Sequence, residues 1–586
     1  MRKNNKNISK QKIKKKRQKT KSLEDIRIFN LLIKFSCAFS LLLIYLFLKE
    51  NKNFNNQKGY KNNLIKENFF VIDSNNLKSV KSHMYGFSVS KTGILTDNYF
   101  KKKNYTEDLE PQGAYIMIRK NEEEIRISQD YFGSFGLYLY ENKNKDYFAL
   151  SNSFLLLEEY LVGKQNFSFN KAFADNFIVT PFCSPSINET MINEITKLPS
   201  NAVIIINIEK KEIKFSYIDY KEGTIPIESE EGLKLIDKWV DKWGYIIRSL
   251  KKQTDNFAFD LTGGFDTRLV LSLLLNSGIN IKNTYIRSVN RNNPSYNEDF
   301  KIASNISSKL GFNLDNNTFD NRSIKWSLND TIFSSVYPKL GVHKVFNLQK
   351  EFYLKPRFIF SGSGGENIRG YPGYPIEQYI ERISSQAKNI TKHENEFYNS
   401  TLKLCYKNLD LLKYLRSYNN SFEISADFYA KSFSRSHFGS EIVENFLANV
   451  YLIQPLIDPD IKKIKFDIKD QYPHDLIAYI YFRFAKDLIY VQIEGNRFLN
   501  SLSVKKAEKL NKMNSRYEIK SELNENFYID IERKCPVPST FEYSKAENYF
   551  TDLFKSYKFF KDIKKYYIND IDEFVREYNL KSDSFS

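Results

Sequence analysis

The 586-residue sequence has few residues of the kinds that form disulfide bonds or bind zinc. It contains five histidines and four cysteines, and the cysteines, Cys37, Cys183, Cys405 and Cys535, share no short spacing. Disulfide-stabilised secreted domains have many more cysteines in a much shorter chain. The sequence therefore excludes a disulfide scaffold and argues against a zinc site built from cysteine and histidine.

Acidic residues are scarce in residues 1–66 but not in the rest of the chain. Residues 1–66 contain 18 Lys/Arg and 3 Asp/Glu, a net charge of +15, whereas the other 520 residues contain 70 basic and 67 acidic side chains, a net charge of +3. Most of the chain thus lacks the positive field that attracts nucleic-acid backbones. We predict no nucleic-acid binding; a basic nucleic-acid arm at the N-terminus is the weaker alternative. With 41% hydrophobic residues, the chain is not wholly disordered.

A long apolar run, residues 29–48, follows the basic tail. Sixteen of its 20 residues are apolar, and a helix of this length crosses a hydrocarbon layer of about 30 Å. We predict a single transmembrane anchor with the basic tail in the cytoplasm. Because Lys34 interrupts the run, a cleaved signal peptide and a helix lying in the membrane interface stay open as alternatives. This topology places the folded body across the membrane from the tail; the opposite placement, with the body in the cytoplasm, stays open.

Short segments of alternating apolar and polar residues follow. Such alternation, interrupted by Asn, Lys and Asp, predicts antiparallel strands with one buried face. The segments that show it are 114–119, 124–128, 136–140, 147–150 and 202–208.

From residue 226 the pattern changes to helices that alternate with buried strands. Ser229–Lys251 has apolar residues at helical spacing, and 257–261, 283–289 and 357–360 are short apolar runs. Strand–helix–strand alternation predicts a parallel sheet whose carboxyl ends bring their loops into one crevice.

The segment Phe257–Gly278 (FAFDLTGGFDTRLVLSLLLNSG) predicts a strand, a tight loop and an apolar helix from Arg268. Such a corner directs backbone N–H groups and the positive end of a helix dipole at an anion. Gly263 and Gly264 allow close approach of a phosphate, and Asp266 can hold Mg²⁺. No Gly-Lys-Ser/Thr follows, so this is not a Walker A loop. A purely structural turn is the alternative.

The loop and its helix (LTGGFDTRLVLSLLL) resemble the SGGxDS pyrophosphate loop of ATP-pyrophosphatase enzymes, and specifically of the asparagine synthetase branch. Ser361–Tyr371 (SGSGGENIRGY) is similar to that family's second signature, and Gln454–Ile461 (QPLIDPDI) to its P-x-x-D-P segment. Ser128–Tyr160 resembles the family's glutaminase-type N-terminal domain. The resemblance covers roughly residues 69–500 in the family's order.

This resemblance implies an ATP- and Mg²⁺-dependent ligase that adenylates a small-molecule or peptide carboxylate and transfers it to an amine or ammonia. Asp266 and Glu366 would be the catalytic acids and the metal ligands. The nucleotide would be held by Leu261, Thr262, Gly263, Gly264, Asp266, Thr267, Arg268, Ser361 and Gly362.

Two features of the ATP-binding domain depart from the family's pattern. In the second signature, Ser363 and Asn367 replace acids, which leaves Glu366 to balance Asp266. The family's late lysine, which stabilises the adenylated intermediate, has no assigned counterpart, and the candidates, which could equally be surface lysines, are Lys486, Lys505 and Lys506.

The nucleophilic N-terminal cysteine of the glutaminase domain is also missing. Only Cys37, inside the apolar run, precedes the first strand, and Cys183 has no histidine nearby. We therefore expect a degenerate domain that releases no ammonia. The amine would be free ammonia, an external amine or part of the substrate, as in the similar β-lactam synthetases and lasso-peptide cyclases. A membrane-anchored pseudoenzyme that keeps the fold is the alternative function.

The expected fold class is α/β plus β-rich: a transmembrane helix, a glutaminase-like (Ntn-type) antiparallel β-sandwich, and an α/β domain with a parallel sheet and a pyrophosphate loop. The expected segments are a basic tail (1–28), the anchor (29–48), a flexible linker (49–67), the degenerate glutaminase-like domain (68–225), the ATP-binding domain (226–515) and a helical C-terminal extension (516–586).

Overall fold

The computed structural model describes residues 67–530 apart from 162, 169, 174–175, 177–184, 290–293, 316–323, 326–350, 353–356, 370, 386–393, 416, 419, 448–449, 466–473 and 515–526. The predicted tail, anchor segment 29–48 and Cys183 lie outside the described residues. Within the described ranges, no helix has the length and apolar character needed to cross a membrane.

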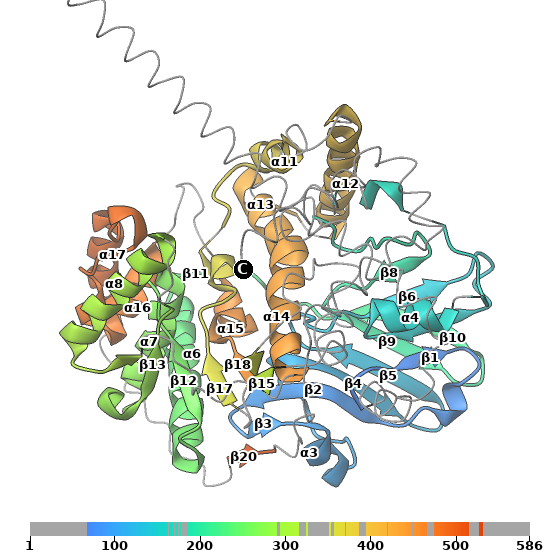
Figure 1. Ribbon diagram of the computed structural model, residues 1–586, viewed down its shortest axis with the longest axis horizontal. Helices are drawn as coiled ribbons and strands as arrows, with labels where there is room; N and C mark the ends of the chain where they lie inside the picture. The colour runs from blue at the N-terminus through green and yellow to red at the C-terminus, as the bar shows by residue number, and fades with distance from the viewer. Residues whose placement is uncertain are drawn as a thin grey trace, which may run out of the picture.

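Antiparallel strands form the first part of the chain (Figure 1). One sheet has the order β1 (Val71–Asp73), β7 (Phe148–Ser151), β6 (Tyr138–Glu141), β8 (Ile195–Lys197). The other has the order β10 (Glu212–Tyr217), β9 (Ala202–Asn207), β5 (Glu124–Gln129), β4 (Gly113–Lys120), β2 (His83–Ser90), β3 (Gly93–Leu95), β20 (Tyr528–Ile529).

The predicted alternation is confirmed in these sheets. In β5, Ile125 and Ile127 are fully buried whereas Arg126 between them is exposed. Buried side chains from both sheets, such as Ile116 and Leu150, belong to one apolar core. Two short helices, α3 (Asp97–Lys102) and α4 (Phe154–Leu161), complete this part.

Only residues 527–530 of the C-terminal extension are described, and the helical sequence predicted there, such as Phe559–Tyr578, lies outside the described residues. Within 527–530 the chain is extended: β20 pairs in parallel with β3, with Tyr528 opposite Gly93. The Asp530 carboxylate accepts hydrogen bonds from Thr96 Oγ1 and Tyr99 N, each at 2.8 Å. Residues 527–530 therefore lie at the edge of the seven-stranded sheet.

The second part of the chain contains a five-stranded sheet in which every neighbouring pair is parallel. Its order is β14 (Leu314–Asp315), β13 (Tyr285–Arg287), β12 (Phe257–Asp260), β17 (Arg357–Phe360), β18 (Val450–Ile453). The mixed α/β class, with antiparallel and parallel sheets, is thus confirmed. Two-stranded pairs are formed by β11 (Ile225–Pro226) with β19 (Ile464–Lys465) and by β15 (Ile324–Lys325) with β16 (Glu351–Phe352).

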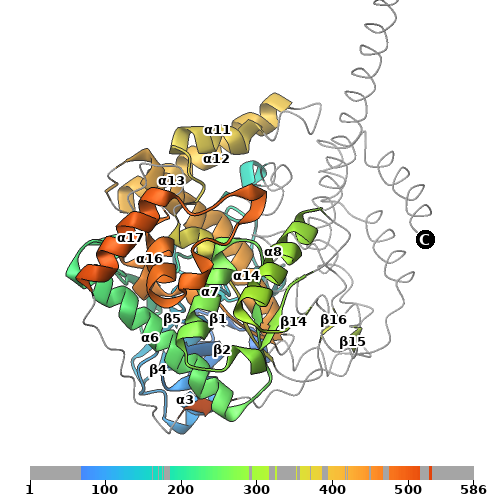
Figure 2. The same ribbon diagram turned by 90° about the vertical axis from the view of Figure 1, so that its left-hand side faces the viewer.

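Helices cover the parallel sheet. Figure 2 shows a group of them on one side of the molecule: α6 (Glu230–Gln253), α7 (Phe265–Asn276), α8 (Pro294–Leu310), α16 (Asp475–Phe484) and α17 (Ser501–Met513). The amphipathic helix predicted for Ser229–Lys251 is confirmed as α6. Ser229 Oγ caps it by accepting a hydrogen bond from Gly232 N at 2.9 Å, and Trp239 and Trp243 bury its apolar face.

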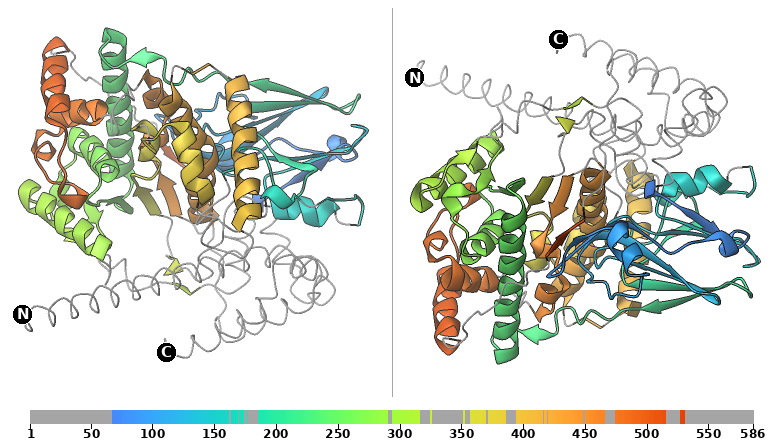
Figure 3. Two further views of the ribbon diagram at one scale, coloured as in Figure 1. Left: turned by 90° about the horizontal axis from the view of Figure 1, so that it is seen from above. Right: turned by 90° about the horizontal axis from the view of Figure 1, so that it is seen from below.

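Helix α14 (Arg435–Leu447) lies between the two parts of the chain (Figure 1), which Figure 3 shows side by side from above and from below. The ring of Phe446 lies 5.4 Å from Phe87 of β2 and 5.8 Å from Tyr451 of β18, measured between centroids. The antiparallel and parallel sheets therefore share one core. A separate apolar cluster holds α11 (Ile376–Ser385), α12 (Glu394–Leu415) and α13 (Ser421–Tyr429), and it includes the buried Cys405.

Candidate functional site

The loops that follow β12 and β17 meet at the carboxyl ends of the parallel strands. β13 and β14 lie on one side of β12, whereas β17 and β18 lie on the other, so the chain order reverses between β12 and β17. Ligands of open parallel sheets bind outside such a reversal, because the loops diverge there and leave a crevice. A cavity of about 580 Å³ lies at this point and is lined by both loops, by His474, and by Ile493, Glu494, Arg497 and Phe498.

The glycine loop after β12 is held by hydrogen bonds between its own threonines and backbone. Thr262 N donates to Thr267 Oγ1 at 2.9 Å, and Gly264 N donates to Thr262 Oγ1 at 3.2 Å. Helix α7 begins at Phe265, earlier than the predicted Arg268, so Asp266 lies in its first turn. The N–H groups of a first helical turn have no partner within the helix and can bind an anion.

The second loop packs directly on the start of α7. A Cβ atom placed on Gly362 would lie 2.5 Å from Thr267 N, and one on Gly365 would lie 2.4 Å from Asp266 Cγ. Both positions therefore require glycine. Their close approach brings Glu366, in the short helix η5 (Gly365–Ile368), to the Asp266 side of the cavity.

Asp266 is paired with a residue that the sequence did not indicate. Arg369, just after η5, donates from Nε to Asp266 Oδ1 at 3.1 Å and from Nη2 to Oδ2 at 3.0 Å. Burial raises the pKa of Asp266, and Arg369 opposes that rise. Burial, together with the Asp266 carboxylate, raises the pKa of Glu366 to about 7. The structure thus places the two predicted acids within electrostatic reach of each other, with Arg369 beside both.

Asp266 and Glu366 could bind a metal ion only together with other ligands. Glu366 Oε2 is buried and has no hydrogen-bond partner in the structure. Mg²⁺ typically binds one or two carboxylates and completes its shell with phosphate oxygens and water. No cluster of three or more His, Cys, Asp or Glu side chains suited to a metal occurs in the part of the chain that the structure describes. Phosphate oxygens and water would therefore supply the remaining ligands.

A third wall of the cavity comes from residues without a recognisable motif. The 3₁₀ helix η10 (Glu494–Asn496) lies beside the glycine loop, where a Cβ atom on Gly264 would be 3.5 Å from Glu494 Oε1. Burial and a hydrogen bond with Asp299 raise the pKa of Glu494 to about 7. Asp299 of α8 also accepts a hydrogen bond from Gly263 N at 2.8 Å. Carboxyl groups therefore lie over the loop that was predicted to bind phosphate.

Arginine and histidine complete the electrostatics of the cavity. Arg497 lines it and donates from Nε to the carbonyl oxygen of Glu494 at 2.9 Å. Burial, with the nearby positive charge of Arg369, lowers the pKa of His474 to about 4, so this imidazole is neutral at pH 7. None of these residues was predicted, because their segment carries no glycine loop or acidic signature.

The predicted nucleotide-binding residues divide into two sets. The cavity is lined by Thr262, Gly264, Asp266, Thr267, Gly362 and Glu366, whereas Leu261, Gly263, Arg268 and Ser361 lie behind its surface. Arg268 is fully buried and donates to the carbonyl oxygens of Gly263, at 2.7 Å, and Val491, at 3.1 Å. It holds the glycine loop against the segment that leads to η10.

The three candidate lysines lie away from the cavity lining. Lys486 Nζ is 5.3 Å from the ring centroid of Phe482, Lys505 is exposed, and Lys506 pairs with Asp475 at 2.6 Å. The cationic side chains in the lining are those of Arg369 and Arg497.

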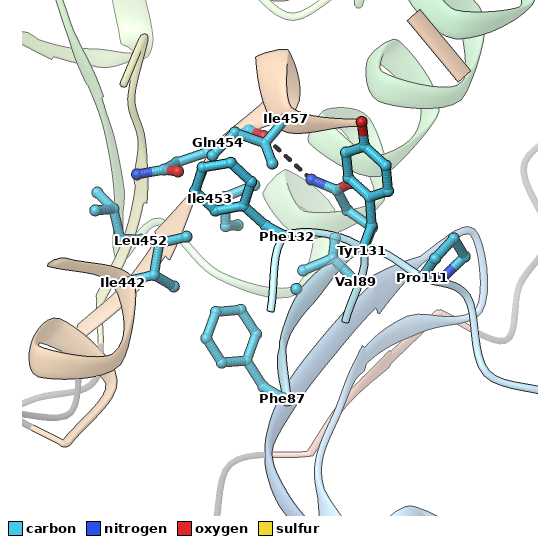
Figure 4. A pocket seen from close by; sticks show the side chains of 12 residues that line it. Phe87, Val89, Pro111, Tyr131, Phe132, Ile442, Leu452, Ile453, Gln454 and Ile457 are labelled. Carbon is cyan, nitrogen blue, oxygen red and sulfur yellow. Dashed lines mark hydrogen bonds between the residues drawn. The ribbon is translucent and has the colours of Figure 1, made fainter. Parts of the chain in front are cut away.

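A much smaller cavity, of about 10 Å³, lies between the two parts of the chain (Figure 4). Phe87 and Val89 of β2 face Leu452, Ile453 and Gln454 across it, and Gln112 Nε2 donates to the Gln454 carbonyl oxygen at 3.1 Å. A cavity of this volume has room for about one water molecule.

Neither a scan against models of protein families nor a search of curated proteins returns a match for this chain. The motifs and the geometry of the cavity therefore carry the functional argument.

Proposed function

We propose that the cavity binds ATP with Mg²⁺ and that the protein adenylates a carboxylate and joins it to an amine, as in the asparagine synthetase-like family. One observation carries the proposal: two glycine-containing loops, far apart in the sequence, converge with Asp266 and Glu366 on a cavity at the chain-order reversal. Its volume of about 580 Å³ lies within the range of small-molecule sites.

The phosphates would bind at the start of α7. There the Thr262–Thr267 loop offers hydroxyl groups and the first-turn N–H groups, and the helix dipole favours negative charge. Asp266 and Glu366 would hold Mg²⁺, which neutralises phosphate charge and makes the α-phosphorus more electrophilic. Arg497 takes the place of the family's late lysine in this proposal, because it is a cation in the lining on the wall beside the glycine loop.

The reaction would have two steps. A carboxylate oxygen of the substrate attacks the α-phosphorus, the bond to the bridging oxygen breaks, and pyrophosphate leaves. The amine then attacks the acyl carbon and loses a proton, and AMP leaves with the bonding electrons. In both steps the protein acts by positioning the reactants and by stabilising charge.

The antiparallel part would be a degenerate glutaminase-like sandwich that serves as a structural partner of the synthetase domain. In this proposal the amine reaches the synthetase cavity from solution or as part of the substrate.

We also propose that residues 29–48 anchor the protein in a membrane with the N-terminal tail in the cytoplasm. Protease treatment of intact vesicles, read with an antibody against the C-terminus, tests the side on which the body lies. Protection of the C-terminus in vesicles of inside-out orientation would place the body across the membrane from the tail. Cleavage in these vesicles would place both on the cytoplasmic side, where ATP is abundant.

A second candidate function is a nucleotide-binding module without catalysis. Two contacts favour it: Arg369 occupies the Asp266 carboxylate, and Asp299 occupies the Gly263 N–H group. Such a protein would bind ATP but form neither AMP nor pyrophosphate.

Measuring AMP and pyrophosphate formation separates the candidates. The full-length chain is incubated with ATP, Mg²⁺ and a panel of amino acids and dicarboxylates, and ATP binding is measured in parallel. We expect turnover that Asp266→Asn abolishes and that Asp255→Asn, a change of an exposed aspartate outside the cavity, preserves. Binding without turnover supports the second candidate. Absence of nucleotide binding by the wild type contradicts both.

A further inference from the structure

Arg369 forms a two-point ion pair inside the cavity. Its guanidinium contacts both carboxylate oxygens of Asp266, at 3.0 and 3.1 Å, and the side chains of Arg369 and Asp266 are 21% and 17% exposed. Charge-assisted, bidentate pairs of this geometry are among the stronger polar contacts in proteins. Asp266 is therefore strongly paired before any ligand binds.

Arg369 and a metal ion would compete for Asp266. Both Asp266 oxygens accept hydrogen bonds from Arg369, so a metal ion bound to them would lie close to the guanidinium and be repelled by its positive charge. The charged or polar groups that face Arg369 from other elements are Asp266 of α7, Tyr429 of α13 and His474 before α16, and Glu366 faces it from η5. Burial holds His474 neutral, and Glu366 would be taken by the same ion.

If Arg369 were released from Asp266, its partly buried guanidinium would pair with another negatively charged oxygen. Close contacts at Gly362 and Gly365 place the second loop against the start of α7, so Arg369, which follows that loop, lies near the glycine loop. Guanidinium groups bind phosphate oxygens with the same planar, two-point geometry that they use for carboxylates. The nearest ligand of this chemistry in the proposed complex is the phosphate chain.

We propose that Arg369 is a nucleotide-binding residue that exchanges partners. In the free protein it neutralises Asp266; when the metal nucleotide binds, Asp266 goes to the metal ion and Arg369 goes to a phosphate oxygen. This inference rests on the proposed function and adds to it a residue that the motifs do not identify.

Two binding measurements on the full-length chain test the exchange. The first is Mn²⁺ binding without nucleotide, read by electron paramagnetic resonance. Arg369→Gln should bind Mn²⁺ about tenfold more tightly than the wild type, because it removes the competing cation. The second is calorimetric binding of a non-hydrolysable ATP analogue with Mg²⁺. Here Arg369→Gln should bind about tenfold or more weakly, and Arg369→Lys should fall between.

Arg382→Gln is the matched control. Arg382 lies in α11, donates to the hydroxyl of Tyr374 at an exposed position, and does not line the cavity. It should change neither measurement. Arg369→Lys keeps the charge, so it yields a result even if Arg369→Gln fails to fold.

The outcomes separate this inference from the proposed function. Nucleotide binding that is equal in wild type and both Arg369 variants overturns the exchange and leaves the proposed function standing. Tighter Mn²⁺ binding without weaker nucleotide binding also overturns it, because Arg369 would then be only a counter-ion. Failure of the wild type to bind nucleotide overturns both.

Discussion

Two loops place an aspartate close to a glycine, and the fold uses these aspartates in opposite ways. Asp130, after β5, is 1% exposed and accepts hydrogen bonds from Tyr115 N, Phe132 N and both the N–H and the hydroxyl of Ser134. Asp266 lines a cavity and is paired with a side chain, Arg369. An acid saturated by backbone donors stabilises the fold, whereas an acid with an exchangeable partner at a cavity is available to a ligand.

The largest expected effect breaks the Asp130 loop. Asp130→Ala leaves its backbone donors unsatisfied and leaves the buried Arg435, whose pKa burial lowers to about 10, without the nearby carboxylate. Removing one partner from such a site costs about 3–5 kcal/mol of unfolding free energy. Denaturant unfolding measures this loss. The exposed Asp108→Ala should stay within about 0.5 kcal/mol of the wild type, and a similarly small loss for Asp130→Ala would refute the structural role.

Most of the strands, and both loops at the cavity, could be predicted from the sequence. Alternation in segments such as 124–128 and the apolar run 357–360 correspond to the observed strands β5 and β17, because burial of one or both sheet faces leaves a readable pattern. The glycine signatures also predicted the two loops that meet at the cavity. These features are encoded within short stretches of chain.

Other features depend on contacts between distant segments. β20 is only two residues long, too short for a periodic pattern, and forms by pairing with β3. Arg268 resembles a ligand-binding residue because it follows the loop, but tertiary packing turns its side chain toward Val491. Glu494 and Arg497 reach the cavity without any motif. Sequence patterns do not report the direction of such side chains.

A second prediction concerns a buried glutamate of the antiparallel part. Glu158 of α4 is 4% exposed with an unpartnered Oε2, and burial, together with the charge of Glu159, raises its pKa to about 9. Because the folded-state pKa exceeds the unfolded value, the stability present in acid is lost progressively as pH rises from about 4.5 toward 9. Glu158→Gln removes this loss. Relative to the wild type, the variant should gain about 2 kcal/mol between pH 6 and pH 7.5, measured by denaturant unfolding. A difference that does not change with pH would contradict the buried, neutral glutamate.

A third prediction concerns Asp266 itself. Asp266→Asn should weaken binding of an ATP analogue with Mg²⁺ by about tenfold, because it removes a metal ligand. Its unfolding free energy should fall by about 1.5–3 kcal/mol, less than for Asp130→Ala, because the change removes a charge-assisted pair but leaves Arg369 beside a cavity that water can fill. Calorimetry and denaturant unfolding measure the two effects. Destabilisation as large as that of Asp130→Ala would erase the distinction between the loops.

The smallest effect concerns the carboxylate over the glycine loop. Asp299→Ala frees the Gly263 N–H group and removes a negative charge near the phosphate position, so the ATP analogue should bind a few-fold more tightly. The exposed Asp487→Ala, outside the cavity lining, should leave the affinity unchanged. Weaker binding by Asp299→Ala would show that this side chain supports the loop in its binding conformation.

We propose that the cavity between the two glycine loops is a nucleotide site. A crystal structure of the protein with Mg²⁺ and a non-hydrolysable ATP analogue would test this proposal. We predict the triphosphate on the Thr262–Thr267 loop, the metal ion between Asp266 and Glu366, and Arg369 turned from Asp266 to a phosphate oxygen. A nucleotide bound elsewhere, with the Asp266–Arg369 pair intact, would contradict the claim.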